Sequence, residues 1–140
     1  MAVETEVDVK VVLVPTDLID DNPYNPGEQY PAEEVEAMGK SLQLFGLRQV
    51  PTGRRKDGRV QLAFGHLRLR GFRDNEKSAL EKKKEQWKVF PLILKDLSDT
   101  EMLDYTLVEN LQRREVKPIG VARAIARFTE AHPEIKDKDI

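Results

Sequence analysis

The chain contains no cysteine and only two histidines among its 140 residues. Without cysteine it forms no disulfide, no thiolate metal site and no cysteine nucleophile. The histidines, His66 and His132, lie far apart in sequence and make no recognisable metal-binding pattern.

Long apolar runs and a basic leader are missing as well. No apolar run approaches the roughly 20 residues that a membrane helix needs. Residues 1–9 are acidic, whereas a secretory signal begins with basic residues. We therefore expect a cytoplasmic protein with no membrane partner. A hydrophobic share of 39% and a charged share of 34% fit one domain with a modest core and a heavily solvated surface.

Charge is distributed unevenly along the chain. The whole sequence has a net charge of −2, but residues 46–73 hold eight basic residues and one acidic residue, a net charge of +7. The remainder therefore carries −9. The basic residues of this stretch are Arg48, Arg54, Arg55, Lys56, Arg59, Arg68, Arg70 and Arg73. Arginine favours forked hydrogen bonding to phosphate or carboxylate, so the stretch predicts an anionic partner. The alternative is a solvated face of exposed strands.

Hydrophobic spacing and turn residues predict an order of strands and helices. The expected elements are a strand at 9–14, a loop at 20–31, a helix at 32–45, a hairpin with strands at 50–55 and 59–64, a helix at 66–77, a surface connection or helical extension at 78–86, a strand at 89–95, a helix from residue 98 to about 109–112, and a helix at 119–131. This order predicts a small α/β or α+β domain with a mixed sheet and flanking helices.

Particular residues support these predictions. The β-branched and apolar run at 9–14 is typical of a buried strand, and Pro91 favours an edge position or an irregular start for its strand. Gly58 permits the positive φ of a hairpin turn, and Ser98 with Glu101 forms the pattern of a capping box. The apolar stripes expected to face the core are Val35, Met38, Leu42 and Phe45 in the first helix, Met102, Tyr105 and Val108 in the third, and Val121, Ile125 and Phe128 in the last.

The segment GHLRLR at residues 65–70 joins a strand to a helix through a glycine. Unpaired amides and a partial positive charge at a helix start attract anions. Gly65 lets the backbone approach an anion because it has no Cβ, and Arg68 stands near the helix start. The segment predicts a phosphate site, with solvated surface arginines as the alternative.

A second polar segment, ENLQR at residues 109–113, falls at the expected end of a helix. Glu109 and Asn110 offer neighbouring hard oxygens of the kind that bind Mg²⁺ together with phosphates. Arg113 adds a further phosphate contact. Taken alone, the segment favours the alternative of a polar last turn, with Asn110 in the left-handed conformation that ends helices.

Together these motifs resemble the amino-terminal domain of ParB-type partition proteins, which has a ParB/sulfiredoxin-like fold. Residues 11–26 are similar to the family's opening strand and Asn-Pro loop, and residues 46–51 (GLRQVP) to its Gly-Leu-x-Gln-Pro segment. Residues 65–71 are similar to its Gly-Glu-Arg-Arg motif. Residues 109–113 match its second phosphate motif without change, and Pro118 follows at the family's spacing.

The resemblance implies a switch that binds cytidine triphosphate (CTP) and Mg²⁺, closes two subunits into a clamp around DNA, and reopens by slow hydrolysis. It implies a nucleotide-dependent homodimer, a ParA-like ATPase as a further partner, and a location on the nucleoid or a plasmid. By the same resemblance, residues 1–115 form the nucleotide-binding domain, and residues 116–140 begin a helix-turn-helix region that the sequence does not complete.

The resemblance also assigns roles to individual residues. Asn110 is implied to coordinate Mg²⁺, and Glu109 to assist hydrolysis as the catalytic residue, since a carboxylate can orient the attacking water. The residues implied to contact the nucleotide are Gln49 at the base and ribose and, in the phosphate region, Gly65, His66, Arg68, Arg70, Asn110, Gln112 and Arg113.

Several positions depart from the family's pattern. His66 stands in place of its Glu, Leu67 in place of its first Arg, and Gly71 in place of its final Ala. Losing a charged hydrogen bond costs about 1.5–3 kcal/mol, roughly ten- to a hundredfold in affinity, so Leu67 predicts weaker binding. Val50 separates Gln49 from the proline, so base reading can differ, and ATP and GTP stay as alternatives to CTP.

Two other functions stay open. One is a ParB-like nuclease or ATPase, in which Glu109 and a metal act on a phosphodiester or on ATP. The other is a degenerate domain that keeps the fold without the nucleotide, for which Leu67 is the main support. Sulfiredoxin, in the same superfamily, needs a cysteine beside the phosphate loop, and the absence of cysteine excludes that activity.

Overall fold

The structure, a computed structural model, describes residues 10–25, 30–80, 83–111 and 118–134. Its elements in chain order are β1 (Val11–Pro15), the 3-10 turn η1 (Thr16–Leu18), β2 (Ile19–Asp20), α1 (Ala32–Phe45), β3 (Thr52–Lys56), β4 (Arg59–Leu62), α2 (His66–Ser78), α3 (Glu85–Lys88), β5 (Val89–Leu94), α4 (Asp99–Leu111) and α5 (Pro118–Ala131). No helix in these ranges is long and apolar enough to span a bilayer.

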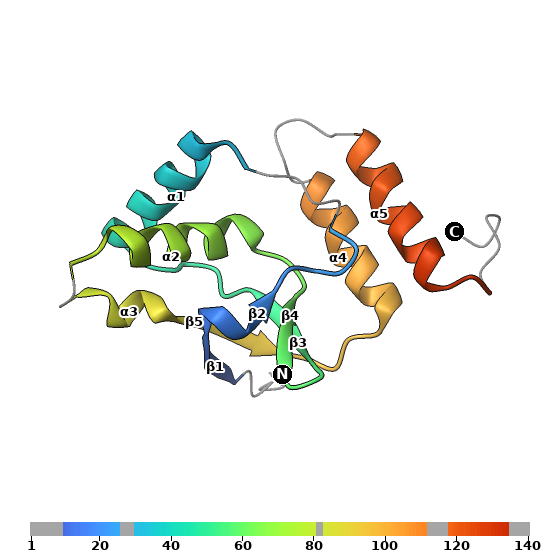
Figure 1. Ribbon diagram of the computed structural model, residues 1–140, viewed down its shortest axis with the longest axis horizontal. Coiled ribbons are helices and arrows are strands. Elements are labelled where there is room, and N and C mark those ends of the chain that lie inside the picture. Colours follow the sequence, from blue (N-terminus) through green and yellow to red (C-terminus); the bar gives the residue numbers. More distant parts are fainter. Residues whose placement is uncertain (1–9, 26–29, 81–82, 112–117, 135–140) are drawn as a thin grey trace, which may run out of the picture.

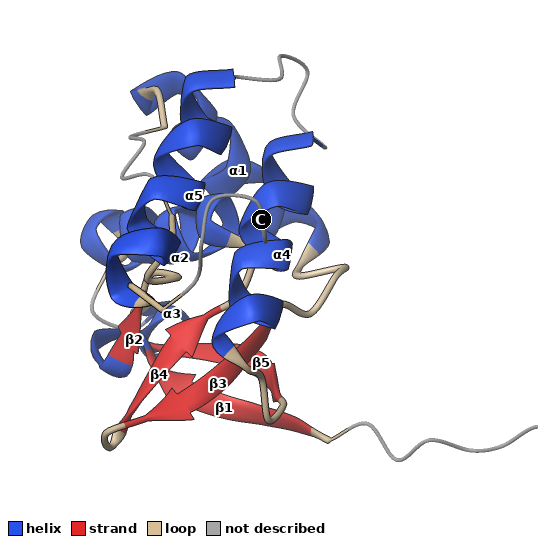
Figure 2. Cartoon of the chain, turned by 90° about the vertical axis from the view of Figure 1, so that its right-hand side faces the viewer, coloured by secondary structure: helices blue, strands red, loops and turns tan. Residues whose placement is uncertain are grey.

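The five strands form one mixed sheet in the order β1-β5-β3-β4-β2. The pairs β1/β5 and β3/β4 are antiparallel, whereas β3/β5 and β2/β4 are parallel. The longer helices gather on one side of the sheet (Figures 1 and 2). The prediction of a small mixed sheet with flanking helices is therefore confirmed.

Two apolar clusters lie beneath the helices. The first fills the space between the sheet and the α1–α2 pair, and its buried members are Val14, Ile19, Leu42, Val60, Leu62, Leu69, Phe72, Trp87, Phe90 and Leu92. The second joins α4 and α5 to the end of β4, and its buried members are Tyr24, Ala63, Met102, Leu103, Ala124 and Phe128. Residues 63–66 connect the two clusters, and the first predicted phosphate motif, residues 65–71, begins within this connection.

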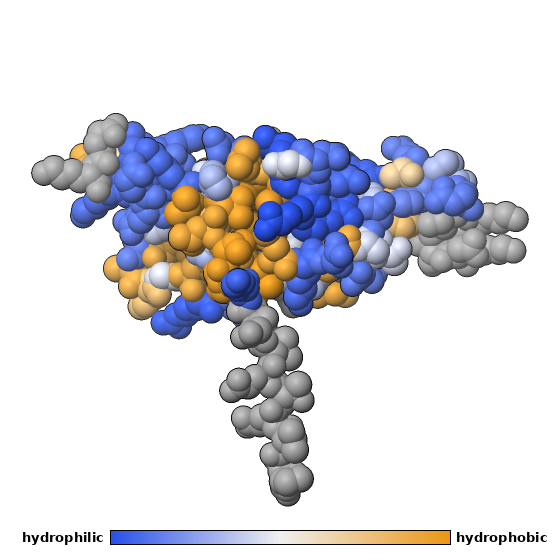
Figure 3. Space-filling view, turned by 90° about the horizontal axis from the view of Figure 1, so that it is seen from below, coloured by the Kyte–Doolittle hydropathy of each residue, from blue (hydrophilic) through white to orange (hydrophobic). Residues whose placement is uncertain are grey.

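The opposite face of the sheet carries apolar side chains at its surface (Figure 3). Val11 and Leu13 of β1 are 49% and 65% exposed, and they pair in register with Ile93 and Pro91 of β5. Paired residues point to the same side of a sheet, so these four share the outer face. The prediction that β1 is a buried strand is therefore wrong: it is an edge strand, and only one of its faces packs on the core.

Pro91 lies in β5, which has neighbours on both sides, so of the two predicted alternatives the edge strand is wrong and the irregular start is what the structure has. Ile93 donates its backbone N–H to Pro51 O, and backbone groups two residues apart point the same way along a strand. The nitrogen of Pro91 therefore points to the side of β3. Pairing with β3 starts only at Ile93, so the missing N–H breaks no ladder bond.

Predictions that depend on neighbours in sequence are confirmed closely. The helix α1 has the predicted bounds and ends at Gly46, whose φ is 72° and whose N–H bonds Leu42 O at 2.9 Å. The hairpin turns at Asp57 and Gly58, both with positive φ. Ser98 Oγ accepts from the N–H of Glu101, and the Glu101 carboxylate accepts from the N–H of Ser98, both at 3.1 Å.

Other details differ from the prediction. Phe45 and Val108, expected in the core, are 62% and 48% exposed. The connection after α2 contains the short helix α3, whose Trp87 is buried and meets Phe72 edge-on at 4.9 Å. In α5 the buried residues include Phe128, as predicted, whereas Val121 and Ile125 are only partly covered. The two-residue strand β2 was expected as loop or left unassigned.

Candidate functional site

Gly65 is the residue at which β4 gives way to α2. It caps the helix in the left-handed region, with φ 93° and ψ 26°. A Cβ at this position would stand 2.7 Å from Pro51 Cγ, well inside van der Waals contact, and Pro51 is fully buried. The chain therefore needs glycine here for its backbone angle and for packing, as well as for the anion approach expected from the sequence.

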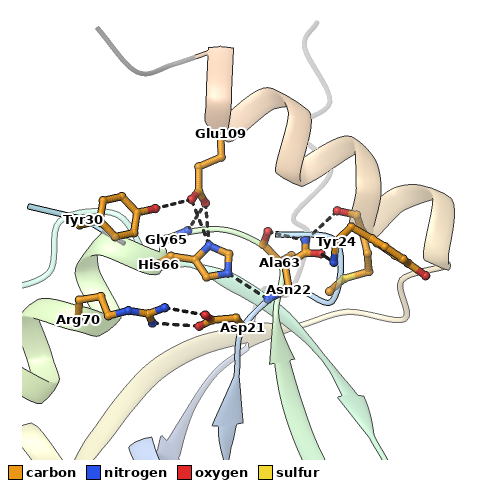
Figure 4. Close-up of polar contacts among 10 residues, drawn as sticks. Asp21, Asn22, Tyr24, Tyr30, Ala63, Gly65, His66, Arg70 and Glu109 are labelled. Carbon is orange, nitrogen blue, oxygen red and sulfur yellow. Dashed lines mark hydrogen bonds and ion pairs between the residues drawn. The ribbon is translucent and has the colours of Figure 1, made fainter. Parts of the chain in front are cut away.

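The carboxylate of Glu109, at the end of α4, lies directly at this turn (Figure 4). It accepts a hydrogen bond from Gly65 N–H at 2.9 Å and from Tyr30 Oη at 3.0 Å, and both of its oxygens lie 3.1 Å from His66 Nδ1. Gly65 and Glu109 are 44 positions apart in sequence. The fold thus brings the two predicted phosphate motifs into contact.

These hydrogen bonds offset the effect of burial on the pKa of Glu109. Burial on its own would raise the pKa of this carboxyl group. The bond from His66, together with those from the Gly65 amide and the Tyr30 hydroxyl, outweighs burial and holds the pKa below its ordinary value. The group is therefore an ionised acceptor at neutral pH, and its side chain is 21% exposed.

His66 is almost fully enclosed, with 1% of its surface exposed. Its second ring nitrogen, Nε2, accepts the backbone N–H of Asn22 at 3.0 Å. Asn22 is itself 2% exposed; its amide nitrogen donates to Ala63 O at 3.0 Å and Met102 O at 2.7 Å, and its amide oxygen accepts from Tyr24 N–H at 2.9 Å. One buried amide therefore ties the loop after β2 to the end of β4 and to α4.

Arg70 forms a bidentate pair with Asp21 (Figure 4). The two N···O distances are 2.9 and 2.6 Å. Burial alone would raise the pKa of Asp21, but the hydrogen bonds and the positive charge of Arg70 lower it below the ordinary value. The guanidinium expected to hold phosphate thus has a carboxylate partner within the protein.

Arg68 and Gln49, the expected phosphate and base contacts, touch each other at the surface. Arg68 Nη2 donates to Gln49 Oε1 at 2.8 Å. The Nη1 atom of Arg68 lies 4.0 Å from the position that a Cβ would take at Gly65. This pair therefore connects the segment before β3 with the start of α2.

The remaining predicted residues follow Glu109. The side-chain nitrogen of Asn110 is buried and finds no hydrogen-bond partner among the described residues. Gln112 and Arg113 lie outside the described residues, so their predicted contacts stay predictions. Within the described ranges no group of three His, Asp or Glu side chains stands close enough to hold a metal ion. A metal here would need the oxygens of a bound ligand in addition to those of the protein.

Two cavities meet at Phe64 and Glu109. The larger, about 630 Å³, lies between α1 and the start of α2 and is lined by Tyr30, Glu34, Ala37, Met38, Ser41, Phe64, Gly65, His66, Leu67, Arg68 and Glu109. The smaller, about 440 Å³, is lined by Gln49, Val50, Phe64, Tyr105, Val108 and Glu109. Both volumes fall in the range of small-molecule sites, roughly 300–1,000 Å³.

Several other arginines of the basic stretch have partners inside the molecule. Arg54 pairs with Asp99 at 2.8 Å, and Arg59 with Asp20 at 2.9 Å. Arg73 donates to the carbonyl oxygen of Ile19 at 2.8 Å. For these three residues the expectation of an anionic ligand is corrected, because groups of the protein itself bind them. Arg59 is nevertheless exposed on its strand, as the alternative predicted.

Sequence reasoning did not single out Asp21, Asn22 and Tyr30 as site residues. The turn sequence at residues 20–26 was interpreted only as a loop, although a polar pair before proline was a usable signal. Nothing in the sequence around Tyr30 indicates that it contacts the site. All three meet the motifs only through contacts across more than 40 positions.

The fold and the joined motifs define a small α/β domain in which a glycine turn at the start of one helix bonds a carboxylate at the end of another. The family model described as the ParB N-terminal domain matches residues 2–111. The chain therefore belongs to the ParB N-terminal domain family, as the motifs predicted.

Curated relatives include nucleoid occlusion proteins. The chain is 30% identical over 125 residues to that of Bacillus subtilis, covering 88% of this chain and 41% of the relative. It is 31% identical over 121 residues to that of Bacillus pumilus, covering 85% and 38%. The chain thus spans about two fifths of the length of these relatives.

Solved structures support the fold. The chromosome-partitioning protein ParB of Caulobacter crescentus, C-terminally truncated and complexed with CTP-gamma-S, matches with a TM-score of 0.58 at 21% identity, covering 93% of this chain and 68% of that one. The same protein complexed to the centromeric parS site also matches at 0.58, covering 91% and 61%.

Proposed function

We propose that this chain is the nucleotide-binding domain of a ParB-like DNA clamp that binds CTP with Mg²⁺ and hydrolyses it slowly. The observation that carries the proposal is the contact between Glu109 and the Gly65 amide. It joins the family's two phosphate motifs at the meeting point of two cavities of suitable size. The matching Caulobacter protein in complex with CTP-gamma-S supports the choice of ligand.

The two cavities suggest how the nucleotide lies. Gly65 and Arg68 line the larger one, which we assign to the phosphates, and Gln49 lines the smaller one, which we assign to the base and ribose. The hydrogen bond between Arg68 and Gln49 runs between these two sets of residues. A ligand that carries a base and a triphosphate would replace that bond with one contact to each residue.

Binding exchanges partners that the protein already supplies. The Gly65 amide donates to Glu109, and Arg70 is paired with Asp21. A phosphate that recruits either group must displace a carboxylate, so part of its binding energy is spent on the exchange. Together with Leu67, this predicts a modest affinity for the nucleotide.

Asn110 is the residue that we assign to the metal. The nitrogen of its side-chain amide is buried and lacks a partner among the described residues, and a simple flip of the amide would exchange this nitrogen with the oxygen. A single amide oxygen fits Mg²⁺ only when phosphates and water supply the other ligands. When bound, the ion would neutralise phosphate charge. Glu109, ionised beside the phosphate cavity, accepts a hydrogen bond from the attacking water.

Calorimetric titration of the chain with CTP, ATP, GTP and UTP, each with and without Mg²⁺, tests the proposal. We expect binding of CTP that strengthens with Mg²⁺. Absence of heat with all four nucleotides would overturn the proposal and favour the degenerate domain. A preference for ATP or GTP would keep the site and change the base.

A pair of arginine variants locates the site. Arg68→Ala removes the proposed phosphate contact and should weaken CTP binding by about ten- to a hundredfold, the usual effect of one charged hydrogen bond. Arg55→Ala removes an equal charge from an exposed position on β3 that lines neither cavity. Equal losses in the two variants would show a general effect of charge and no specific site.

DNA binding, dimerisation and a ParA-like partner belong to the same proposal. The Caulobacter protein bound to the parS site supports DNA as a ligand. Nucleotide-dependent cross-linking between two copies of the chain tests the clamp, and a monomer at every CTP concentration would argue against it. The domain boundary at residue 115 stays a prediction, next to a family match that ends at 111.

The nuclease or ATPase alternative is tested by the same titration with ATP and by plasmid cleavage. No acidic cluster in the described ranges is suited to hold a metal by itself. Cleavage that depends on metal and on Glu109 would place this alternative ahead of the clamp.

A further inference from the structure

We infer that His66 is a positioning residue for Glu109: its Nδ1–H tautomer, selected by the backbone of Asn22, orients the carboxylate beside the phosphate cavity. The part of this inference that concerns hydrolysis depends on the function proposed above. The tautomer and the orientation depend only on contacts within the chain.

The tautomer follows from what each neighbour can do. A backbone N–H only donates, and that of Asn22 points at His66 Nε2 at 3.0 Å. Nε2 must therefore be the unprotonated nitrogen, and the ring proton lies on Nδ1. Nδ1 stands 3.1 Å from both oxygens of Glu109, which only accept. In the other tautomer both contacts would be repulsive.

The imidazole of His66 has no free nitrogen to offer a phosphate, although the residue borders the larger cavity. The residue is 1% exposed, and each ring nitrogen already has a partner within the protein. Glu109 is more open, with 21% of its side chain exposed, and it lines both cavities. The imidazole therefore acts on the nucleotide through Glu109, whereas the sequence predicted that it binds the nucleotide itself.

Orientation matters because a carboxylate has several acceptor positions. Gly65 N–H, Tyr30 Oη and the His66 ring occupy positions on the side of α2 and of the loop before α1. The exposed remainder of the carboxylate borders the cavities. Removing the donor at His66 would let the carboxylate rotate, and a misplaced catalytic group loses activity steeply.

Nitrogen NMR of the chain without nucleotide tests the tautomer directly. The chain has only two histidines, and the spectrum of His66→Gln identifies the signals of His66. We expect a protonated Nδ1 and an unprotonated Nε2. A protonated Nε2 with a bare Nδ1 would overturn the inference, whatever the nucleotide experiments show.

Two substitutions separate positioning from structure. The amide of His66→Asn takes the place of Nδ1 and can donate to Glu109, but it loses the acceptor for Asn22. The amide of His66→Gln takes the place of Nε2 and keeps that acceptor, but it loses the donor to Glu109. We therefore expect the Asn variant to melt at a lower temperature than the Gln variant.

Activity should follow the opposite order. In His66→Gln we expect kcat for CTP hydrolysis to fall by about ten- to a hundredfold, the effect of one charged hydrogen bond, with KM nearly unchanged. In His66→Asn we expect kcat to stay within about threefold of wild type. If activity instead followed stability, with the Asn variant the less active, His66 would be a structural residue only.

Hydrogen exchange at the Gly65 amide provides a readout without nucleotide. The amide should exchange roughly tenfold faster in His66→Gln and in Glu109→Ala than in wild type, and more slowly in His66→Asn than in His66→Gln, although His66→Asn is the less stable of the two. Equal rates in wild type and His66→Gln would overturn the inference. If wild type hydrolyses no nucleotide but the tautomer and exchange results are as expected, the proposed function fails and the positioning role stands.

Discussion

The guanidinium of Arg70 and the carboxylate of Asp21 face each other through two parallel hydrogen bonds of 2.9 and 2.6 Å, although the residues are 49 positions apart. The pair attaches the loop after β2 to the first turns of α2. The next residue in that loop, Asn22, reaches His66 and α4. The start of α2 is thus held from both sides by a segment that follows the opening strands.

The ion pair between Asp21 and Arg70 should make the free energy of unfolding depend on pH. The folded pKa of Asp21 lies below its unfolded value, because Arg70 outweighs the effect of burial. The stabilisation is therefore fully present above the unfolded pKa, near 4, and is lost as pH falls through the folded pKa. Urea unfolding of wild type and Asp21→Asn should show a stability difference at pH 7 that shrinks below about pH 4. A difference independent of pH would contradict the charge-pair explanation.

Replacing Gly65 by alanine should destabilise the protein more than replacing Gly58, another glycine with a positive φ angle. Gly58 has φ 78° and nothing within 4 Å of an added Cβ, whereas at Gly65 the Cβ would meet Pro51 Cγ at 2.7 Å. Gly58→Ala should cost about 1–2 kcal/mol from the left-handed backbone alone. Gly65→Ala should cost about 1–3 kcal/mol more, because Pro51 must move. Denaturant unfolding measures both values, and equal costs would show that Pro51 moves freely.

Leu67→Arg should strengthen CTP binding. Leu67 lines the larger cavity beside Gly65 and Arg68, at the position where the family motif has an arginine. One added charged hydrogen bond predicts about ten- to a hundredfold tighter binding. Leu44→Arg, at a position on α1 that is 76% exposed and lines neither cavity, is the control for charge. If calorimetry shows no gain in CTP affinity for Leu67→Arg, the phosphates do not bind in this cavity.

Asn22→Ala should destabilise the whole domain. The substitution leaves two buried carbonyl oxygens and one backbone N–H without the partners they now have. Met102 lies inside α4, where its carbonyl oxygen keeps its helical hydrogen bond, so two groups are left unpaired. Unpaired buried groups cost about 1–3 kcal/mol each, so a loss of about 2 kcal/mol or more is expected. Ser98→Ala, which removes an exposed helix cap, should cost about 1 kcal/mol. Thermal unfolding compares the two, and similar losses would mean that water replaces Asn22.

Features determined by neighbours in sequence were predictable from the residues. The bounds of α1, the turn at Asp57 and Gly58, and the cap at Ser98 each depend on contacts within about four positions. The family motifs at residues 65–71 and 109–113 identified the family in the same way, because they are short and keep their order. Motifs of this kind can be identified from the local sequence alone.

Only the tertiary structure decided which of these residues meet, and in what role. The sequence placed Arg70 and His66 among the nucleotide contacts, but the fold pairs Arg70 with Asp21 and encloses His66 between Asn22 and Glu109. The sequence likewise indicated a buried strand where β1 lies at the edge of the sheet. In each case the partner stands more than 40 positions away. Residue type limits which bonds a side chain can form, and packing selects among them.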